Sequence, residues 1–269
     1  MMILAPLSLV VLIVLISANV WVSSLVYHRY LTHRAMDLNK WVARALTLYL
    51  QGMAFAPPLS WVASHAAHHA RTDTAEDPYS PEVHGFWRVV FLTPLLVTRW
   101  RMRYGETIIA KYTRRVPDRR FYEFCDRTWW CSLMMAAFAG AFFMLLGWAG
   151  LLVYAIESYG FYVLMGWFNA TGHTQGDRPS QNSGTNRHGA RWLFMNLCMA
   201  GELLHNHHHH APHSANFGLS GETDVGYLVC RALAFARLAT ILDAGRSAQS
   251  ANIGWRFRNA TPEDARGEE

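Results

Sequence analysis

Two long stretches of the chain are almost free of charged side chains, and they determine its architecture. No charged residue occurs in residues 1–26, and residues 129–168 hold a single charge, on Glu157. A helix needs about 20 apolar residues to cross the roughly 30 Å hydrocarbon core of a bilayer. The pattern therefore predicts three spans, at about residues 3–26, 129–148 and 150–168, with LLGWAGLL as the turn between the last two.

The other apolar segments are too short or too interrupted to cross alone. Gly52 and the Pro57-Pro58 pair break residues 41–63, because proline kinks or ends a helix. We expect this segment to be re-entrant or interfacial. The further expected elements are a segment at 86–98 that is too short to span, a basic helix at headgroup level over 99–128, and helices over 191–204 and 225–242.

These patterns predict an all-α integral membrane protein with about three transmembrane helices and a cytoplasmic helical cap. We expect one domain over residues 1–245, followed by a polar, disordered tail at 246–269. The first span has neither a basic leader nor a small-residue cleavage site, so we interpret it as an anchor rather than a removed signal peptide.

The charge distribution indicates which side of the membrane the cap occupies. The formal net charge is +5, and the basic residues lie in the polar segments rather than before the first span or in the 147–150 turn. Short loops rich in Lys and Arg stay cytoplasmic, which predicts a cytoplasmic active face, most simply on a bacterial inner membrane. No nucleic-acid motif accompanies the charge, so anionic lipid headgroups are the expected contact and nucleic acid is not.

The 14 histidines are the chemically informative residues, because most of them fall into spaced groups. The groups are His28-x4-His33, His65-x2-His68-His69 and His205-x2-His208-His209, with His173 as a further candidate just past the last span. Residues i and i+3 or i+4 share a helix face, so each HxxHH group can direct several rings to one point. The i,i+5 pair shares a face poorly and is expected where a helix frays or ends. Neutral imidazole is a common ligand of Zn, Cu, Fe and Ni, and eight or nine rings suit two ions better than one.

The motifs around these histidines resemble those of a known family. HRYLTHR, HAAHHARTDTAEDP and GELLHNHHHHAPHSANFGL resemble the three histidine boxes of the membrane fatty acid desaturases, and NATGH resembles the Asn-x3-His of their bacterial Δ9-type acyl-lipid and acyl-CoA branch. The resemblance covers roughly residues 20–220. It implies a non-haem di-iron centre that uses O2 and two electrons to remove two hydrogens from adjacent methylenes of a fatty acyl chain.

The resemblance also implies roles for individual residues. It makes nine histidines the iron ligands: His28, His33, His65, His68, His69, His173, His205, His208 and His209. It has Asn169 hold a metal-bound water, and Asp73, Asp77, Glu202 and Asn206 orient the rings. The division of the ligands between the two irons stays open, and His84, His188, His207, His210 and His213 are expected at the surface or behind the ligands.

The partners follow partly from what the chain lacks. No cytochrome b5 signature, CxxC pair or GxGxxG motif occurs, so electrons must come from a separate ferredoxin- or cytochrome b5-type donor with its reductase. The basic stretches 99–103 and 114–120 would bind either that donor or lipid headgroups. Ala63-Ser64 and Ala66 stand where eukaryotic acyl-CoA enzymes of the family have Arg-Asp and Arg. This weakens CoA as the acyl carrier and leaves phospholipid or acyl carrier protein open.

Several features of the sequence each allow two interpretations. Glu157 is either buried against a partner or near an acyl tunnel, and QGMAFAPPLSW is either a tunnel wall or ordinary packing. Family members usually have one more span before the first box, so we expect either three crossings with the N-terminus outside or an incomplete start. The cysteines Cys125, Cys131, Cys198 and Cys230 show no CxxC spacing and are expected to be reduced and inert.

The alternatives to a desaturase differ in chemistry. A related hydroxylase or acetylenase would have the same boxes. A histidine-rich metal transporter would place its ligands near the bilayer midplane, whereas these lie outside the apolar runs. The remaining class is a non-catalytic histidine-rich membrane module or a b-type haem protein. A haem protein would need histidines within facing spans, and residues 3–26, 129–148 and 150–168 have none.

Overall fold

The structure is a computed structural model, and it describes residues 4–186, 192–219 and 222–245. The described chain is mainly helical, with very little strand. The helices are α1 (Leu4–Val22), the π-helix η1 (Ser23–Thr32), α2 (Lys40–Met53), α3 (Pro58–Arg71), α4 (Pro81–His84), α5 (Phe86–Tyr112), α6 (Arg119–Cys125), α7 (Thr128–Leu146), α8 (Trp148–Thr174), α9 (Leu193–Cys198), α10 (His205–His210) and α11 (Val225–Phe235). The two strands are β1 (Met36–Leu38) and β2 (Ala239–Ile241).

Among the described residues, three helices are long and apolar enough to cross a membrane, which confirms the predicted fold class. They cover Leu9–Thr32, Thr128–Leu146 and Trp148–Thr174. The first and third therefore run about one and a half turns past the ends expected at residues 26 and 168. The polar residues that seemed to mark those ends remain helical and are buried, so the spans project into the cap.

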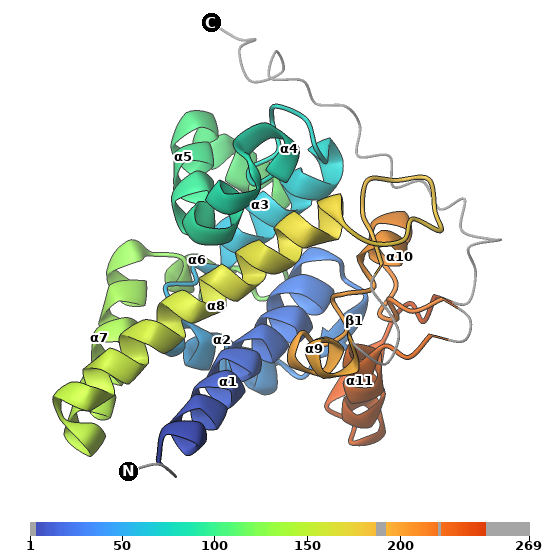
Figure 1. The fold of residues 1–269 in the computed structure, drawn as a ribbon. Helices are drawn as coiled ribbons and strands as arrows, with labels where there is room; N and C mark the ends of the chain where they lie inside the picture. Colours follow the sequence, from blue (N-terminus) through green and yellow to red (C-terminus); the bar gives the residue numbers. More distant parts are fainter. Residues whose placement is uncertain (1–3, 187–191, 220–221, 246–269) are drawn as a thin grey trace, which may run out of the picture.

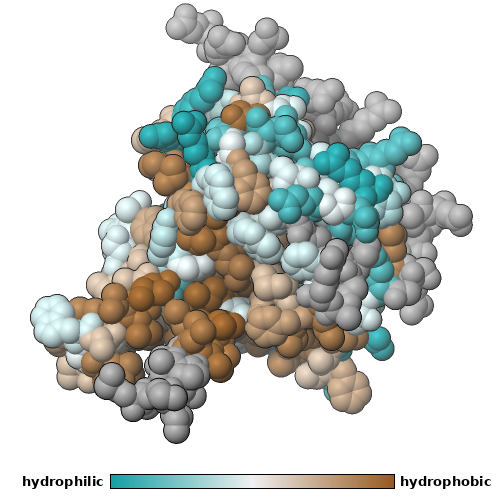
Figure 2. Space-filling view, in the orientation of Figure 1, coloured by the Kyte–Doolittle hydropathy of each residue, from teal (hydrophilic) through white to brown (hydrophobic). Residues whose placement is uncertain are grey.

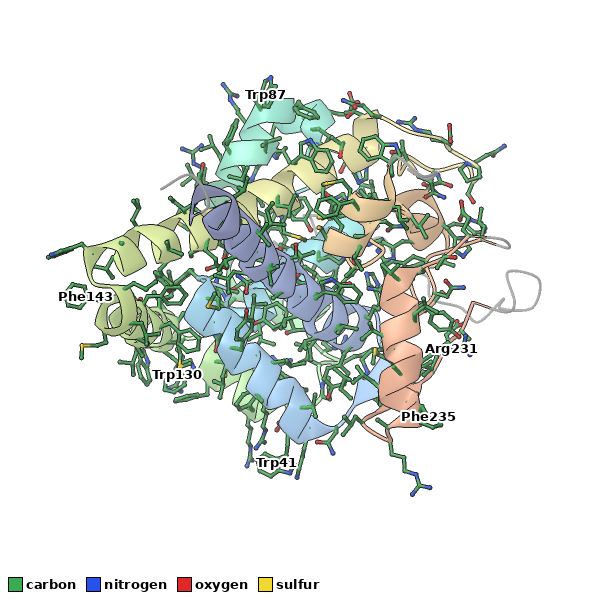
Figure 3. All side chains as sticks on the ribbon, turned by 60° about the horizontal axis from the view of Figure 1, so that its bottom comes forward. Trp41, Trp87, Trp130, Phe143, Arg231 and Phe235 are labelled. Carbon is green, nitrogen blue, oxygen red and sulfur yellow. The ribbon has the colours of Figure 1, made fainter. Side chains whose placement is uncertain are left out.

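The apolar and polar parts of the surface are separated. Figure 1 shows α1 and α8 side by side, with α7 beside the lower part of α8, and with α3, α4, α5 and α10 toward the other end. Figure 2 shows hydrophobic residues gathered over the lower ends of α1, α7 and α8, and hydrophilic residues on the opposite side. Only 6% of the most apolar part of α7 is buried inside the protein, and Phe143 points outward from this helix (Figure 3). This surface suits contact with lipid.

The break expected near Pro57 lies between α2 and α3. Helix α2 ends at Met53, and α3 begins at Pro58, where proline is well tolerated because the first helical N–H lacks a partner anyway. Three tyrosine hydroxyls satisfy carbonyls of the break: Tyr154 donates to Gly52 (2.7 Å), Tyr27 to Ala56 (2.8 Å) and Tyr162 to Phe55. A non-helical backbone needs such partners where water is scarce.

Three expected helices differ in extent. The segment 86–98 and the first part of 99–128 share one long helix, α5, which kinks at Gly105 (φ 68°) and ends at Tyr112, and α6 covers Arg119–Cys125. Of the described residues in the helix expected at 191–204, the α-helix α9 takes in 193–198. Helix α11 ends at Phe235, near Arg237 with its left-handed backbone (φ 59°), and β2 then pairs antiparallel with β1. Strands of three residues are too short to leave a periodic sequence signal. The tail expected at 246–269 lies outside the described residues.

Glu157 is buried against a partner, as one of its two interpretations held. Its carboxyl group accepts a hydrogen bond from the Asn19 side chain, and both residues are fully buried between α8 and α1. Polar side chains that bond across helices are a recurring way to join helices inside a membrane.

The crossing of α5 over α8 depends on a glycine. A Cβ placed on Gly166 would lie 2.6 Å from the carbonyl oxygen of Val90, closer than real Cβ atoms approach. On the exposed face of α7, a Cβ on Gly140 would meet nothing within 4 Å. The two glycines therefore provide a matched pair for testing how closely these helices pack.

We expect Gly166→Ala to lower the stability by about 1–3 kcal/mol, the usual cost of overpacking a close contact. Gly140→Ala should leave it unchanged or raise it by about 0.5–1 kcal/mol, because alanine loses less backbone entropy in a helix. Thermal unfolding in detergent, followed by tryptophan fluorescence, measures both. Equal shifts in the same direction would contradict the close crossing of α5 and α8.

Candidate metal centre

The first histidine pair lies at the end of a π-helix. In η1 the backbone bonds from residue i+5 to residue i, and the His33 N–H donates to the His28 carbonyl at 3.0 Å. The chain does leave the helix here, as the i,i+5 spacing led us to expect, with His33 as the C-cap. The π geometry nevertheless brings the two rings together, with centroids 4.8 Å apart.

The second histidine group lies on α3. His65 and His69 are four residues apart and share a helix face, whereas His68 is rotated away from His69 by about 100°. The Nε2 atoms of His65 and His69 are 3.1 Å apart. The Nε2 of His68 instead belongs to a different set of donor atoms.

The third group, on α10, distributes its rings in the opposite way. His205 and His209 share a face, with their Nε2 atoms 3.0 Å apart. His208 points to the set that contains His69, at 2.9 Å between Nε2 atoms. His173, in the last turn of α8, joins His205 at 3.0 Å.

The nine rings thus form two adjacent groups, in each of which the donor atoms lie within 4.8 Å of one another. The five-histidine group contains His28, His33, His65, His69 and His208. The four-histidine group contains His68, His173, His205 and His209. Each HxxHH motif contributes to both, two rings to one group and one to the other.

Carboxylates hold the outer nitrogens of three rings. The Nδ1 contacts are His28 to Glu202 (2.9 Å), His68 to Asp77 (2.8 Å) and His173 to Asp73 (3.1 Å). Burial by itself would raise the pKa of Asp73, but the hydrogen bond from His173 lowers it below its usual range, and Glu202 behaves likewise beside His28. An ionised carboxylate only accepts, so each Nδ1 donates and the Nε2 lone pair faces the group.

Burial keeps the rings in the form that binds metal. It is the main cause that lowers the pKa of His33, His65, His205 and His208 well below 6.5. The Nε2 of His68 is buried and has no hydrogen-bond partner among the described residues. Neutral imidazoles with inward lone pairs and an all-nitrogen donor set fit two first-row transition-metal ions.

Two of the residues expected around the ligands have other contacts. Among the described residues, Asn206 bonds to the 180–184 loop through Ser180, Asn182 and Gly184 rather than to a ring. It holds that loop against α10. Asn169 donates to the Tyr79 carbonyl at 3.0 Å and lies at the wall of a cavity that also touches His205.

The residues outside the expected ligand set also have defined places. His84 contacts the Asp77 carbonyl (3.1 Å) and His213 the His33 carbonyl (2.8 Å), so both lie behind the ligands. His207 is mostly buried and His210 is exposed. His188 lies outside the described residues.

Sequence reasoning missed a buried arginine that connects the boxes. Arg29 is fully buried, contacts Glu202 (3.3 Å) and Asp224 (3.1 Å), and lies 3.8 Å over the ring of Phe217. Its place inside HRYLTHR was visible, but an arginine after a span usually marks the interface. Tyr79, whose hydroxyl contacts His65 Nδ1 at 3.1 Å, was also missed.

A cavity of about 640 Å³ leads to the histidines. His28, His65 and His205 line it, and so do Arg101 and Glu106. The rest of the wall is mostly apolar, with Trp61, Phe161, Met165 and Phe168 among its residues. The segment QGMAFAPPLSW contributes Phe55, Ala56, Pro57, Ser60 and Trp61, which favours its interpretation as a tunnel wall.

The structure is thus that of a helical membrane protein whose projecting spans and cap gather nine buried or partly buried histidines into two groups that could hold metal ions. The chain belongs to the fatty acid desaturase family, whose sequence model matches residues 4–220. The resemblance seen in the histidine boxes is thereby confirmed.

Individual relatives are similar over most of this chain. The Delta-9 desaturase-like 2 protein of Arabidopsis thaliana is 33% identical over 72% of this chain and 62% of its own length. The sn-1 stearoyl-lipid 9-desaturase of Synechocystis sp. is 28% identical (79% and 64%), and the icosanoyl-CoA 5-desaturase of Limnanthes douglasii is 29% identical (86% and 63%). The chain thus spans less than two thirds of the length of each of these relatives.

We expect Asp77→Asn to weaken metal binding by about 10- to 100-fold, the usual effect of losing a partner that orients a ligand. The amide could donate to His68 Nδ1 and turn its proton toward the metal position. Anaerobic titration with Fe(II) measures the affinity, and Asp37→Asn, at an exposed ion pair with Arg34, is the control. Equal affinities of the two variants would contradict the orienting role of Asp77.

Proposed function

We propose that the chain is an O2-dependent fatty acyl desaturase with two non-haem irons, one in each histidine group. The observation that supports this most directly is the mostly apolar cavity that passes His28, His65 and His205. Such a cavity suits a long hydrocarbon and places its methylenes beside both groups. The family membership points to the same chemistry.

The overall reaction balances when an external reductant supplies two electrons. One –CH2–CH2– unit, O2, two electrons and two protons give –CH=CH– and two waters. No acid–base side chain breaks an unactivated C–H bond, so the bound irons would supply the oxidising power that this requires. The nine histidines are proposed as their ligands.

The protein's own residues position and shield that chemistry. Asp73, Asp77 and Glu202 fix the ring tautomers, and the buried Arg29 holds Glu202 in place. The walls around Trp61 and Phe161 exclude water from the cavity. Asn169, which already lies at the cavity wall near His205, would hold a metal-bound water.

The finer assignments are also proposals. We place the active face in the cytoplasm of a bacterial inner membrane, with residues 1–245 acting as one domain. The electron donor is a separate ferredoxin- or cytochrome b5-type protein that docks on exposed basic residues of the cap. Two of the relatives are named for position 9, the Delta-9 desaturase-like 2 protein and the sn-1 stearoyl-lipid 9-desaturase, and we propose the same position here.

Expression in a host of defined lipid composition should produce new double bonds, which mass spectrometry of the fatty acids locates. His68→Ala should abolish them and lower the iron content, because it removes a buried ligand of the four-histidine group. His210→Ala, at an exposed ring outside both groups, should leave them unchanged.

Fatty acids that gain an oxygen atom instead of a double bond would show a hydroxylase. Unchanged products and iron content in His68→Ala would remove His68 from the ligands. Uptake of metal into vesicles without any change in unsaturation would favour a transporter.

A further inference from the structure

A second hollow, here called the lateral groove, lies beside the histidine-lined cavity. It has a volume of about 490 Å³ and is lined mainly by Phe91 and Leu95 of α5, Met135 of α7, and Ala155 and Tyr159 of α8. No charged side chain lines it. Its chemistry suits a hydrocarbon and not a polar ligand.

The lateral groove lies at the depth of the membrane. Met135 and Tyr159 are inside the spans Thr128–Leu146 and Trp148–Thr174, away from the ends that hold the cap. Phe91, Leu95 and Tyr159 are 44%, 43% and 52% exposed. A groove that opens here faces lipid chains rather than water.

The lateral groove adjoins the cavity. Phe55, Pro94 and Tyr162 line both hollows and form the partition between them. Within this partition the Tyr162 hydroxyl donates to the Phe55 carbonyl. Phe55 belongs to the non-helical break between α2 and α3, and Pro94 interrupts the hydrogen bonds of α5. The backbone on both sides of the partition is therefore held by fewer bonds than a regular helix.

Part of the cavity lining is charged and exposed, at Arg101, Met102 and Glu106. Arg101 is about one third exposed there and pairs with Glu106 and Asp126. Met102, beside it, is 72% exposed. This exposed, charged part of the lining, here called the polar mouth, would admit an acyl chain on a water-soluble carrier, whereas a chain that belongs to a bilayer lipid meets the lateral groove first.

We propose that the lateral groove is a substrate entrance, through which an acyl chain of a bilayer phospholipid slides between α5, α7 and α8 into the histidine-lined cavity. The Tyr162–Phe55 contact is the gate. This inference rests on the proposed function for its substrate and names the carrier of the acyl chain as membrane phospholipid.

Photolabelling in vesicles tests the route without depending on catalysis. The probe is a phosphatidylglycerol with a diazirine in the distal part of one acyl chain, in vesicles of otherwise unlabelled phosphatidylglycerol and phosphatidylethanolamine. Peptide mapping should find label in the groove segment around Tyr159 and in the cavity segment at residues 161–169. An acyl-CoA with the same diazirine is the comparison probe for the polar mouth.

Two variants fill the lateral groove from opposite sides. Ala155 is exposed and lines only the groove, so Ala155→Trp should cut phospholipid labelling of the cavity by about tenfold or more. Met135→Trp should do the same from α7. Ile156→Trp is the matched control, because Ile156 is 46% exposed and lines neither hollow. Labelling by the acyl-CoA probe should change in none of the three, which shows that the cavity is intact.

Equal phospholipid labelling of the cavity in Ala155→Trp, Met135→Trp and Ile156→Trp would overturn the inference. The inference would also fail if the phospholipid probe labelled the groove in none of the proteins, because another helix or a second copy would then cover the groove. Labelling of the cavity by the acyl-CoA probe alone would overturn it as well. Groove-dependent labelling without any double bond in the lipids would refute the proposed desaturase and leave the entrance standing.

Discussion

The structure depends on gathering nine imidazoles into two groups inside the protein, where most of the rings are buried. Burial lowers the pKa of such rings, as it does for His33 and His205. Burial alone does not choose the tautomer. Carboxylates such as Asp77 and Glu202 do, because they accept a hydrogen bond from Nδ1–H and leave the Nε2 lone pair free.

The fold meets this requirement by extending membrane helices into the cap. The first span continues as a π-helix that brings His28 and His33 together, and α8 continues to His173. Arg29 then ties the first box to the third through Glu202, and to α11 through Asp224. Asp224 lies beyond residues 4–220, the part that the family model matches, so a segment outside that part supports the centre.

Much of this was predictable from sequence, and the misses have physical reasons. Charge-free stretches show spans directly, and spaced histidines show ligand candidates. Their division into two groups was not readable, because it depends on how α3 and α10 face each other in space. The π-helix that ends at His33 could not be predicted for the same reason, because hydrogen bonds from residue i+5 to residue i depend on tertiary packing. Three-residue strands have no periodicity, and the burial of Arg29 follows from tertiary contacts with Asp224, 195 residues away.

The central claim is that two irons lie in the two histidine groups, and iron analysis combined with X-ray absorption of the purified, iron-supplied protein tests it most directly. The account predicts two irons for each folded chain, with imidazole scattering dominating the first coordination sphere. A folded chain that retains one iron or none, or irons with sulfur ligands, would contradict it.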